Sequence, residues 1–461
     1  MGTIQEVFPK KAHVLAIPLP GQGHINPMLQ FCRILATNYG IKITLLLTNN
    51  ITKSMQYAPT NSLINIETIS DGTEESNIQD NSVVAFFKQF QSKVSPSLVE
   101  IIEKKKKSSQ AVNILLYDSV IPWALDIAKE YGLFGVSFFT QSCSVTAVYY
   151  HMMLGTMNND DSLVSSVPNF PLMGTKDLPS FSYFKDYSKD VMLLLLNQFS
   201  NIQEVDWALF NTFDKLEEEV VKWMASKWPI KTIGPLIPST YLTKTHNDNG
   251  KEDSRIHLFK PDYESCMKWL HERDDNSVIY VSFGSAAGVE QEQMEELAYA
   301  LKEINQYFLW VVRDSEEHKL PKDFKSESLE KGLIVKWCNQ LDILNHKAIA
   351  CFLTHCGWNS TLEALSMGLP MIAIPQFVDQ MTHAKFIEDV WKVGIRPKLN
   401  KKEIVTREEI STCIDEVVHG KRGKEFKRNA LKWKDLAKQS MFEGGNSRKT
   451  IEEFISKVTS L

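Results

Sequence analysis

The sequence predicts an α/β protein built from two doubly wound parallel sheets, and three observations lead to this expectation. Short apolar runs alternate with stretches of helical spacing along most of the chain, a pattern typical of parallel sheets with helices on both faces. A polar stretch near residues 239–258, rich in turn formers and charge, interrupts the alternation. The 461 residues, 43% of them hydrophobic, are enough for two domains with large buried cores.

In the first half, the predicted strands are short apolar runs bounded by turn-forming or polar residues. They cover residues 13–18, 41–47, 64–69, 112–117, 136–139 and 207–210. Helical spacing predicts helices over residues 28–39, 83–106, 123–131 and 141–153, and a further apolar helix around 191–196. Because strand and helix alternate, we expect these strands to pair in parallel.

The second half repeats the pattern. Strands are predicted at residues 277–283, 308–312, 333–336, 349–354 and 371–374, and helices at 361–367, 424–440 and 448–458. We expect an N-terminal domain over residues 1–238, a linker over 239–258, a second domain over 259–440 and a terminal segment over 441–461. Such sheets bind ligands beyond the carboxyl ends of their strands, so we expect the site in a cleft between the domains.

Charge and cysteine usage exclude several classes of function. Lys and Arg number 51 against 56 Asp and Glu, a net charge of −5 that argues against a nucleic-acid or anionic-membrane partner. The seven cysteines are odd in number and include no C-x-x-C pair, which favours reduced thiols over a disulfide frame or zinc site. Since the chain lacks a signal-peptide pattern and its most apolar run is far shorter than the about 20 residues of a membrane span, we expect a cytoplasmic protein.

A candidate phosphate site follows the strand predicted at 349–354. The loop Thr354–Ser360 leads into a helix, and Asn359 and Ser360 are strong N-cap residues, so the first helical turn can offer N–H groups and a positive dipole end. The plainer interpretation is a capping box formed by Ser360 and Glu363. It leaves unexplained the aromatic, histidine, acidic and amide residues gathered in the block 337–380.

A candidate base follows the first strand. The segment Pro20–Pro27 lacks the third small residue of a dinucleotide-binding fingerprint, so an NAD site is a weak interpretation. His24 stands at the mouth of the predicted sheet, and an imidazole with a pKa near 6.5 suits proton abstraction. Asp118, at the end of another strand, can accept from the imidazole N–H and stabilise the imidazolium. The alternative for Asp118 is a helix cap.

The 44-residue block from Trp337 to Gln380 closely resembles the donor-binding signature of plant UDP-dependent glycosyltransferases. The resemblance extends from the Gly21–Pro27 motif to the C-terminal helices, and it is closest to the subgroup that glucosylates small acids, phenols, terpenoids and steroids. It implies the GT-B fold, with two Rossmann-like domains facing across a cleft. It also implies that the C-terminal helices pack back toward the N-terminal domain.

The resemblance implies a donor contact for each residue of the signature. By position, Trp337 and Cys338 would bind uracil, Gln340 and Glu363 the ribose, Ser285, His355, Asn359 and Ser360 the diphosphate, and Trp358, Asp379 and Gln380 the sugar. Gln380 favours UDP-glucose, because His often accompanies galactose at this position in the family. Two residues depart from the family pattern, Ala350 in place of the usual Gly and His383 in place of the usual Asn.

The acceptor pocket is expected in the N-terminal half. Its candidate contacts are Val120, Thr140, Gln141 and Gly23, with Phe377 facing them from the other domain and Thr140 also able to touch the sugar. Residues 167–189, with five aromatic residues and three prolines, are either a loop over a lipophilic acceptor or ordinary surface and core.

The resulting hypothesis is a monomeric, inverting UDP-glucose-dependent glucosyltransferase that makes β-O-glucosides of steroid, terpenoid or phenolic hydroxyls. His24 would act as base, UDP-glucose would be the co-substrate, and neither cofactor nor metal is expected because the sequence contains no Asp-x-Asp motif. The alternatives are glucose-ester formation on small carboxylic acids, a non-catalytic UDP-sugar or hormone binding protein, and an NAD-linked oxidoreductase. A hydrolase is disfavoured by the absence of a Gly-x-Ser-x-Gly elbow.

Overall fold

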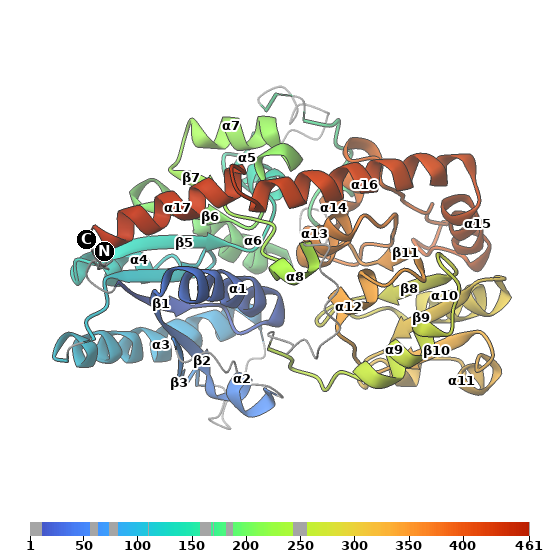
Figure 1. Cartoon of the computed structure of the whole chain (residues 1–461), viewed down its shortest axis with the longest axis horizontal. Helices are drawn as coiled ribbons and strands as arrows, with labels where there is room; N and C mark the ends of the chain where they lie inside the picture. Colours follow the sequence, from blue (N-terminus) through green and yellow to red (C-terminus); the bar gives the residue numbers. More distant parts are fainter. Residues whose placement is uncertain are drawn as a thin grey trace, which may run out of the picture.

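The chain forms two parallel sheets, each covered by helices, as Figure 1 shows for the computed structural model. The structure describes residues 12–55, 63–72, 82–108, 110–156, 167–168, 170–180, 188–242 and 256–460. The first sheet is ordered β3-β2-β1-β4-β5-β6-β7 and the second β10-β9-β8-β11-β12-β13. The predicted α/β fold class, two doubly wound sheets, is therefore confirmed.

The strands of the first sheet are β1 (His13–Ile17), β2 (Lys42–Thr48), β3 (Ile64–Ile69), β4 (Ile114–Asp118), β5 (Phe134–Phe139), β6 (Trp207–Phe210) and β7 (Ile230–Thr232). Those of the second are β8 (Val278–Ser282), β9 (Tyr307–Val311), β10 (Gly332–Val335), β11 (Ile349–Thr354), β12 (Met371–Ala373) and β13 (Gly394–Ile395). The central strands β1, β4, β8 and β11 are buried along their whole length, which explains their continuous apolar sequences.

The described helices are α1 (Gln22–Tyr39), α2 (Asn49–Ser54), α3 (Val83–Lys106), α4 (Ala124–Glu130), α5 (Cys143–Met153), α6 (Ser188–Leu196), α7 (Glu218–Ala225), α8 (Ser239–Leu242), α9 (Tyr263–His271), α10 (Gln291–Glu303), α11 (Phe324–Glu327), α12 (Gln340–Leu344), α13 (Trp358–Met367), α14 (Gln380–Lys385), α15 (Arg407–Val418), α16 (Lys421–Met441) and α17 (Asn446–Thr459). Short 3-10 turns are η2 (Thr175–Asp177), η4 (Asn197–Phe199), η5 (Ile202–Glu204), η6 (Asp214–Leu216) and η7 (Glu317–Lys319), and η8 (Phe386–Val390) is a π turn. None of the helices in the described part of the chain is long and apolar enough to cross a membrane.

Both sheets reverse their strand order at one place, and this is where ligands bind in doubly wound folds. In the first sheet the reversal lies between β1 and β4, which pair with Ile17 opposite Tyr117. In the second it lies between β8 and β11, which pair with Ser282 opposite Thr354. His24, Ser285 and His355 follow three of these strands, and Asp118 ends the fourth. Most of the other predicted site residues follow β5, β10 and β12 or lie in α12, α13 and α14.

Two helices begin earlier than the sequence pattern predicts. Helix α1 starts at Gln22 rather than at residue 28, because two glycines and Pro27 lower the local helix propensity and hide its first turn. Helix α13 has Gly357 as its N-cap and starts at Trp358. Asn359 and Ser360 therefore lie inside the first turn, and the predicted N-cap position of these two residues is wrong.

Two strands were not predicted at all. Strand β7 has three residues and β13 has two, and each lies at the edge of its sheet. Runs this short carry no apolar periodicity, so only their pairing with β6 and β12 makes them strands.

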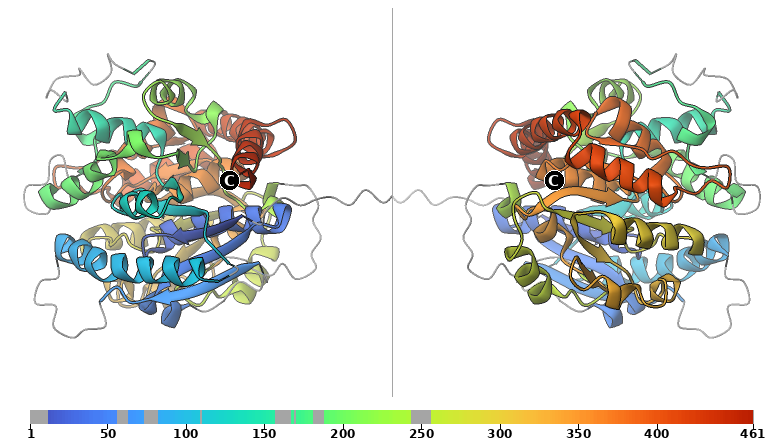
Figure 2. Two further views of the ribbon diagram at one scale, coloured as in Figure 1. Left: turned by 90° about the vertical axis from the view of Figure 1, so that its left-hand side faces the viewer. Right: turned by 90° about the vertical axis from the view of Figure 1, so that its right-hand side faces the viewer.

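The last two helices span both domains. In Figure 1, α16 and α17, drawn in red, run from the second sheet across to the first, and the end-on views of Figure 2 show the red helices on one side of the molecule. Helix α16 packs on α13, whereas α17 packs on β7, and Ile451, Phe454 and Val458 of α17 belong to the core of the first sheet. The C-terminal helices therefore return from the second sheet to the first, as the family resemblance implies.

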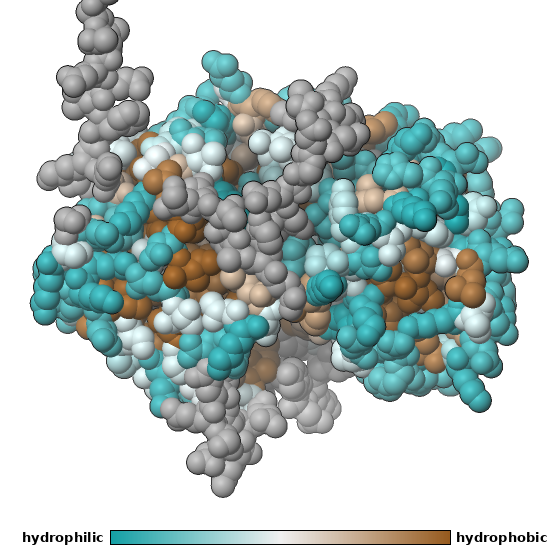
Figure 3. Space-filling model, turned by 60° about the horizontal axis from the view of Figure 1, so that its bottom comes forward, coloured by the Kyte–Doolittle hydropathy of each residue, from teal (hydrophilic) through white to brown (hydrophobic). Residues whose placement is uncertain are grey.

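The surface offers scattered apolar side chains. On the face in Figure 3, apolar areas lie on both domains and are bordered by hydrophilic residues. The most exposed large apolar side chains, Leu172, Leu193 and Leu329, belong to different segments of the chain. Isolated side chains of this kind are normal on a folded surface and carry no functional inference.

Replacing Phe454 by Ala should destabilise the protein by about 3–5 kcal/mol, because the ring is fully buried between Phe31 and Trp207. Urea unfolding followed by circular dichroism measures the loss. The matched control is Phe442→Ala, since Phe442 is 37% exposed and should cost far less. Equal losses in the two variants would contradict the docking of α17 on the first sheet.

Candidate active site

The clearest feature of the candidate site is a histidine–aspartate pair at the reversal point of the first sheet. His24 lies in the first turn of α1, directly after β1, and Asp118 is the last residue of β4. His24 Nδ1 lies 2.7 Å from Asp118 Oδ2. The carboxylate is inaccessible to solvent, whereas the His24 side chain is 30% exposed. The arrangement leaves Nε2 as the nitrogen that can take a proton.

Backbone and side-chain donors hold both members of this pair. Asp118 accepts from the N–H of Val120 at 3.2 Å on Oδ1 and from the N–H of Leu19 at 3.4 Å on Oδ2. Thr140 Oγ1 lies 3.1 Å from His24 Nδ1. These contacts fix the carboxylate and, through it, the plane of the imidazole.

Nearby charges favour the protonated form of His24. Burial by itself lowers the pKa of His24, but the charge of Asp118, its hydrogen bond and the charge of Asp379 outweigh burial and raise the pKa above 6.5. Asp379 belongs to the second domain, so charges from both domains act on the base. A raised pKa suits a group that must hold a proton taken from a substrate.

A direct hydrogen bond joins the turn of His24 to the second domain. Pro27 has no N–H, so the carbonyl of Gly23, four residues earlier, lacks its usual helical donor. Asn359 Nδ2 of α13 donates to that carbonyl at 2.6 Å. The side chain predicted to bind diphosphate therefore touches the residue that precedes the predicted base.

The loop between β11 and α13 belongs to the second domain and leads into the helix whose Asn359 contacts Gly23. Cys356 has a φ of 65°, an uncommon conformation for a residue other than glycine, and it turns the chain sharply into the helix. The first intrahelical bond of α13 runs from the Thr361 N–H to the Gly357 carbonyl. The N–H groups of residues 358–360 are thus left for other partners at the positive end of the helix dipole.

His355 is packed tightly into this loop. A Cβ atom on Gly284 or Gly357 would lie 2.7 or 2.5 Å from His355 Nε2, so a side chain at either position would displace the ring. Burial lowers the pKa of His355 to about 4, although the backbone of Ser282 partly opposes this effect. His355 is therefore neutral at pH 7. Its Nδ1 atom is buried and makes no hydrogen bond of ordinary geometry with any described residue.

The residues predicted for the nucleoside lie around α12 and α13. Gln340 Nε2 lies 2.8 Å from both Ser360 Oγ and Glu363 Oε2, so the amide links the predicted ribose and diphosphate positions. This bond to Ser360 replaces the capping box of the plainer interpretation. Trp337 is 9% exposed, and its ring lies 4.9 Å from that of Phe259. Cys338 is buried next to it.

Arg313 is a residue that the sequence patterns missed. It donates to the carbonyl of Ser285 at 2.6 Å and also to the carbonyl of Ala287. Ser285 is the predicted diphosphate contact after β8, so Arg313 shapes the loop that presents it. The only sequence signal was a charged residue directly after the predicted strand 308–312.

The turn before α14 carries the residues predicted for the sugar. Gln380 Oε1 accepts from the N–H groups of Gln376 and Phe377 at 2.9 and 3.2 Å, so its amide nitrogen is the group available to a sugar hydroxyl. Burial raises the pKa of Asp379, while the nearby His383 and His24 oppose this effect. Phe377 is 37% exposed.

The predicted acceptor contacts in the first domain differ in how they are placed relative to His24. Thr140 lies beside His24, and Gln141 Nε2 is bonded to Thr146 and Gln198 within the first domain. Val120 is 8% exposed and belongs to the core, so its contribution is mainly the N–H bond to Asp118. Of the predicted segment 167–189, residues 169 and 181–187 lie outside the described residues, and so do the side chains of 188–189.

Two indole N–H groups close the interface between the domains behind the site. Trp358 Nε1 donates to the carbonyl of Asn211 at 2.8 Å, and Trp391 Nε1 donates to that of Leu216 at 3.2 Å. Both tryptophan side chains are nearly fully buried. Since each acceptor lies in the first domain, these bonds join the two domains.

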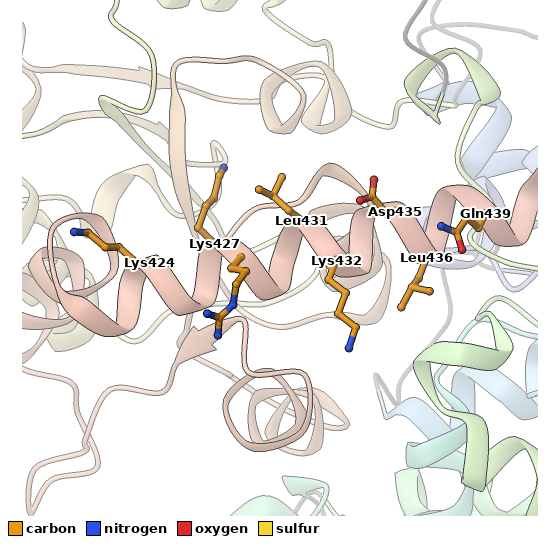
Figure 4. Close-up of a pocket in the computed structure, with 8 residues that line it drawn as sticks. Lys424, Lys427, Leu431, Lys432, Asp435, Leu436 and Gln439 are labelled. Atoms are coloured by element: carbon orange, nitrogen blue, oxygen red, sulfur yellow. The ribbon is translucent and has the colours of Figure 1, made fainter.

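A groove elsewhere on the surface is not part of this site. Figure 4 shows it along α16, where Lys424, Lys427, Arg428, Leu431, Lys432, Asp435, Leu436 and Gln439 line it. None of these is a predicted site residue. Within the described residues, no group of three or more His, Cys, Asp or Glu side chains is arranged to hold a metal ion.

Comparison with known proteins bears directly on this site. A family model described as UDP-glucoronosyl and UDP-glucosyl transferase matches residues 43–443. The chain is 49% identical to UDP glycosyltransferase 9 of Catharanthus roseus, with 99% of each chain covered. It is 44% identical to mogroside I-E synthase of Siraitia grosvenorii, covering 96% of this chain and 98% of that one.

Solved structures give the same picture. Os79 from O. sativa in complex with UDP superposes with a TM-score of 0.88 at 34% identity, covering 96% of this chain and 100% of that one. The same rice protein has also been solved with a trichothecene. These comparisons concern whole chains, so the role of each site residue stays a prediction.

Proposed function

The chain belongs to the UDP-glucoronosyl and UDP-glucosyl transferase family, and we propose that it is an inverting, monomeric transferase that moves glucose from UDP-glucose to a hydroxyl of a small lipophilic molecule. It is a glycosyltransferase that uses a UDP-sugar. Glucose as the sugar and the class of acceptor are the proposal. Membership of this family argues against the two alternatives of an NAD-linked oxidoreductase and a non-catalytic binding protein.

The single observation that carries the proposal is the His24–Asp118 pair at the cleft. His24 Nε2 removes the proton of the acceptor hydroxyl, and the acceptor oxygen attacks the anomeric carbon on the face opposite UDP. The bond to UDP breaks with its electron pair leaving on the diphosphate, so an α-linked donor yields a β-glucoside. Asp118 stabilises the imidazolium through the 2.7 Å bond at Nδ1.

The first turn of α13 supports the proposed diphosphate contacts. The N–H groups of residues 358–360 and the helix dipole, equivalent to about half a positive charge, favour the charge that develops on UDP. Neutral His355, directly before the N-cap loop of α13, is a further proposed contact to a phosphate oxygen. One N–H of the Asn359 side chain donates to the Gly23 carbonyl, so its second N–H is the one available to diphosphate.

Two features of Gln380 support glucose as the transferred sugar: the residue type at this position and the hydrogen bonds of its amide. The oxygen of the Gln380 amide holds the turn, which leaves the nitrogen to donate to a sugar hydroxyl. Asp379 is the matching acceptor on the same turn. A lipophilic acceptor is supported by the rice relative, whose complex contains a trichothecene.

The proposal is tested by mass spectrometry of products from UDP-glucose, UDP-galactose and UDP-glucuronate with a phenol, a sterol-like alcohol, a triterpenoid and an aromatic acid. We expect hexose transfer from UDP-glucose to a hydroxyl and a product stable to mild alkali. In His24→Ala, transfer to alcohols should fall by about 10²–10⁴-fold, and ester formation on an already ionised acid should fall less. An alkali-labile product would instead favour glucose-ester synthesis, and equal losses on both acceptor types would contradict the role of His24.

The pH dependence of kcat/KM should reveal the pKa of His24 and the effect of Asp118 on it. His24 acts only when deprotonated, so the rate rises as pH passes its pKa, which Asp118 and Asp379 hold above 6.5. In Asp118→Asn the negative charge is gone and burial lowers the pKa, so the acid limb should move to lower pH while the plateau rate falls. Asp126→Asn, an exposed aspartate on α4, is the control and should leave the limb in place. A limb that stays or moves upward in Asp118→Asn would contradict the assignment.

Transfer should not depend on a divalent cation. The proposed diphosphate contacts come from helix N–H groups and neutral side chains, so we expect EDTA to change the initial rate by less than about twofold. The measurement compares EDTA-treated protein with the same protein given Mg²⁺ or Mn²⁺. A large loss that added metal restores would contradict this.

A further inference from the structure

The turn that carries Asp379 and Gln380 is held from both sides by the first domain. On one side, the Val378 N–H donates to Ser180 Oγ at 2.7 Å, and the Ser180 N–H donates to the Val378 carbonyl at 3.1 Å. Val378 has a φ of 55°, a rare conformation for a β-branched residue that persists only where the surroundings enforce it. The position of the sugar-facing turn therefore depends on contacts from the other domain.

On the other side stands His383, one helical turn after Asp379. Its ring is 1% exposed and stacks on Trp358 at 5.0 Å between centroids. Nδ1 lies 3.1 Å from the carbonyl of Cys356, and Nε2 lies 3.0 Å from Ser142 Oγ. A carbonyl only accepts, so Nδ1 carries the proton and, in the neutral ring, Nε2 accepts from the Ser142 hydroxyl.

Ser142 lies at a point that links this contact to the base. It is the N-cap of α5, and its Oγ also accepts from the Val145 N–H at 3.1 Å. Two residues earlier, Thr140 contacts His24 Nδ1. The bond from His383 to Ser142 thus connects the helix that begins with Gln380 to the segment that supports His24.

The two ring nitrogens of His383 have different reach. An Asn amide, the group usual at this position in the similar family pattern, extends only as far as Nδ1. It could keep the bond to Cys356 within the second domain, but it is too short to reach Ser142. A Gln amide extends to the position of Nε2. The interdomain bond is therefore a property of the histidine in this chain.

We propose that His383 is a positioning residue, which sets the placement of the donor sugar relative to His24 by tying α14 to the N-terminus of α5. The proposal rests on the proposed function. A displacement of about 1 Å between reacting groups can cost about 10²-fold in rate, so a single interdomain bond at this place can affect kcat. Within the second domain, His383 Nδ1 also lies 3.7 Å from Asp379 Oδ2, and a side-chain amide at position 383 keeps a polar group at the place of Nδ1.

The test compares His383→Asn with His383→Gln in steady-state kinetics with UDP-glucose and the best acceptor. His383→Asn should lower kcat by about tenfold and change the KM for UDP-glucose by less than about twofold, because the bond to Ser142 is lost while the amide keeps a polar group at the place of Nδ1. His383→Gln loses the stacking on Trp358 as well, so the comparison of the two variants isolates the bond to Ser142. His383→Gln should retain more of kcat, since its amide can still reach Ser142. His419→Asn, an exposed histidine of the second domain, is the control for the chemistry of the substitution.

Changing the partner residue guards against a variant that fails to fold. Ser142→Thr keeps both the hydroxyl and the cap and should retain most of kcat, whereas Ser142→Ala should lower kcat. In a His383→Asn background, Ser142→Ala should cause little further loss of kcat, since the shared bond is already broken. Thermal denaturation of every variant separates loss of the α5 cap from loss of alignment.

Three results would overturn the proposal. The first is an equal loss of kcat in His383→Asn and His383→Gln. The second is independent, multiplying effects of His383→Asn and Ser142→Ala, and the third is a change confined to KM for UDP-glucose. Absence of transfer by the unaltered protein would overturn the proposed function itself, which distinguishes that failure from failure of the positioning role.

Discussion

The hydrogen bond between His24 and the solvent-inaccessible carboxylate of Asp118 is the interaction on which the rest of the site depends. A buried carboxylate is costly unless it is hydrogen-bonded, and Asp118 is bonded by two backbone N–H groups as well as by the imidazole. Those N–H groups follow the ends of β1 and β4. The register of two neighbouring strands therefore fixes the carboxylate, and the carboxylate fixes the ring.

The second constraint is a set of hydrogen bonds between the domains, in which side-chain N–H groups of the second domain donate to backbone carbonyls of the first. Buried indole N–H groups need an acceptor, and those of Trp358 and Trp391 find backbone carbonyls 147 and 175 residues away in the chain. Asn359 uses a carbonyl that Pro27 leaves without its helical donor. The donor wall and the base are consequently parts of one packed unit.

Backbone strain and close packing are concentrated on the donor wall. Cys356 and Val378 both have positive φ, and His355 lies so close to Gly284 and Gly357 that neither glycine can gain a side chain without displacing it. Strained residues of this kind persist when surrounding contacts over-determine them. Here the contacts come from the neighbouring domain as well as from the loop, so the conformation of the sugar-facing turn belongs to the assembled molecule.

The sequence alone determined the two-sheet fold and the bounds of elements such as α3, β3 and β11, because their apolar periodicity is strong and local. It also identified His24 and Asp118 as candidates, since both directly follow predicted strands. Only the tertiary structure decided that α1 begins at Gln22, that Gly23 accepts from Asn359 and that His383 reaches Ser142. The two bonds join residues 336 and 241 positions apart, whose pairing no local periodicity encodes. The start of α1 was missed because glycine and proline obscure the helical pattern there.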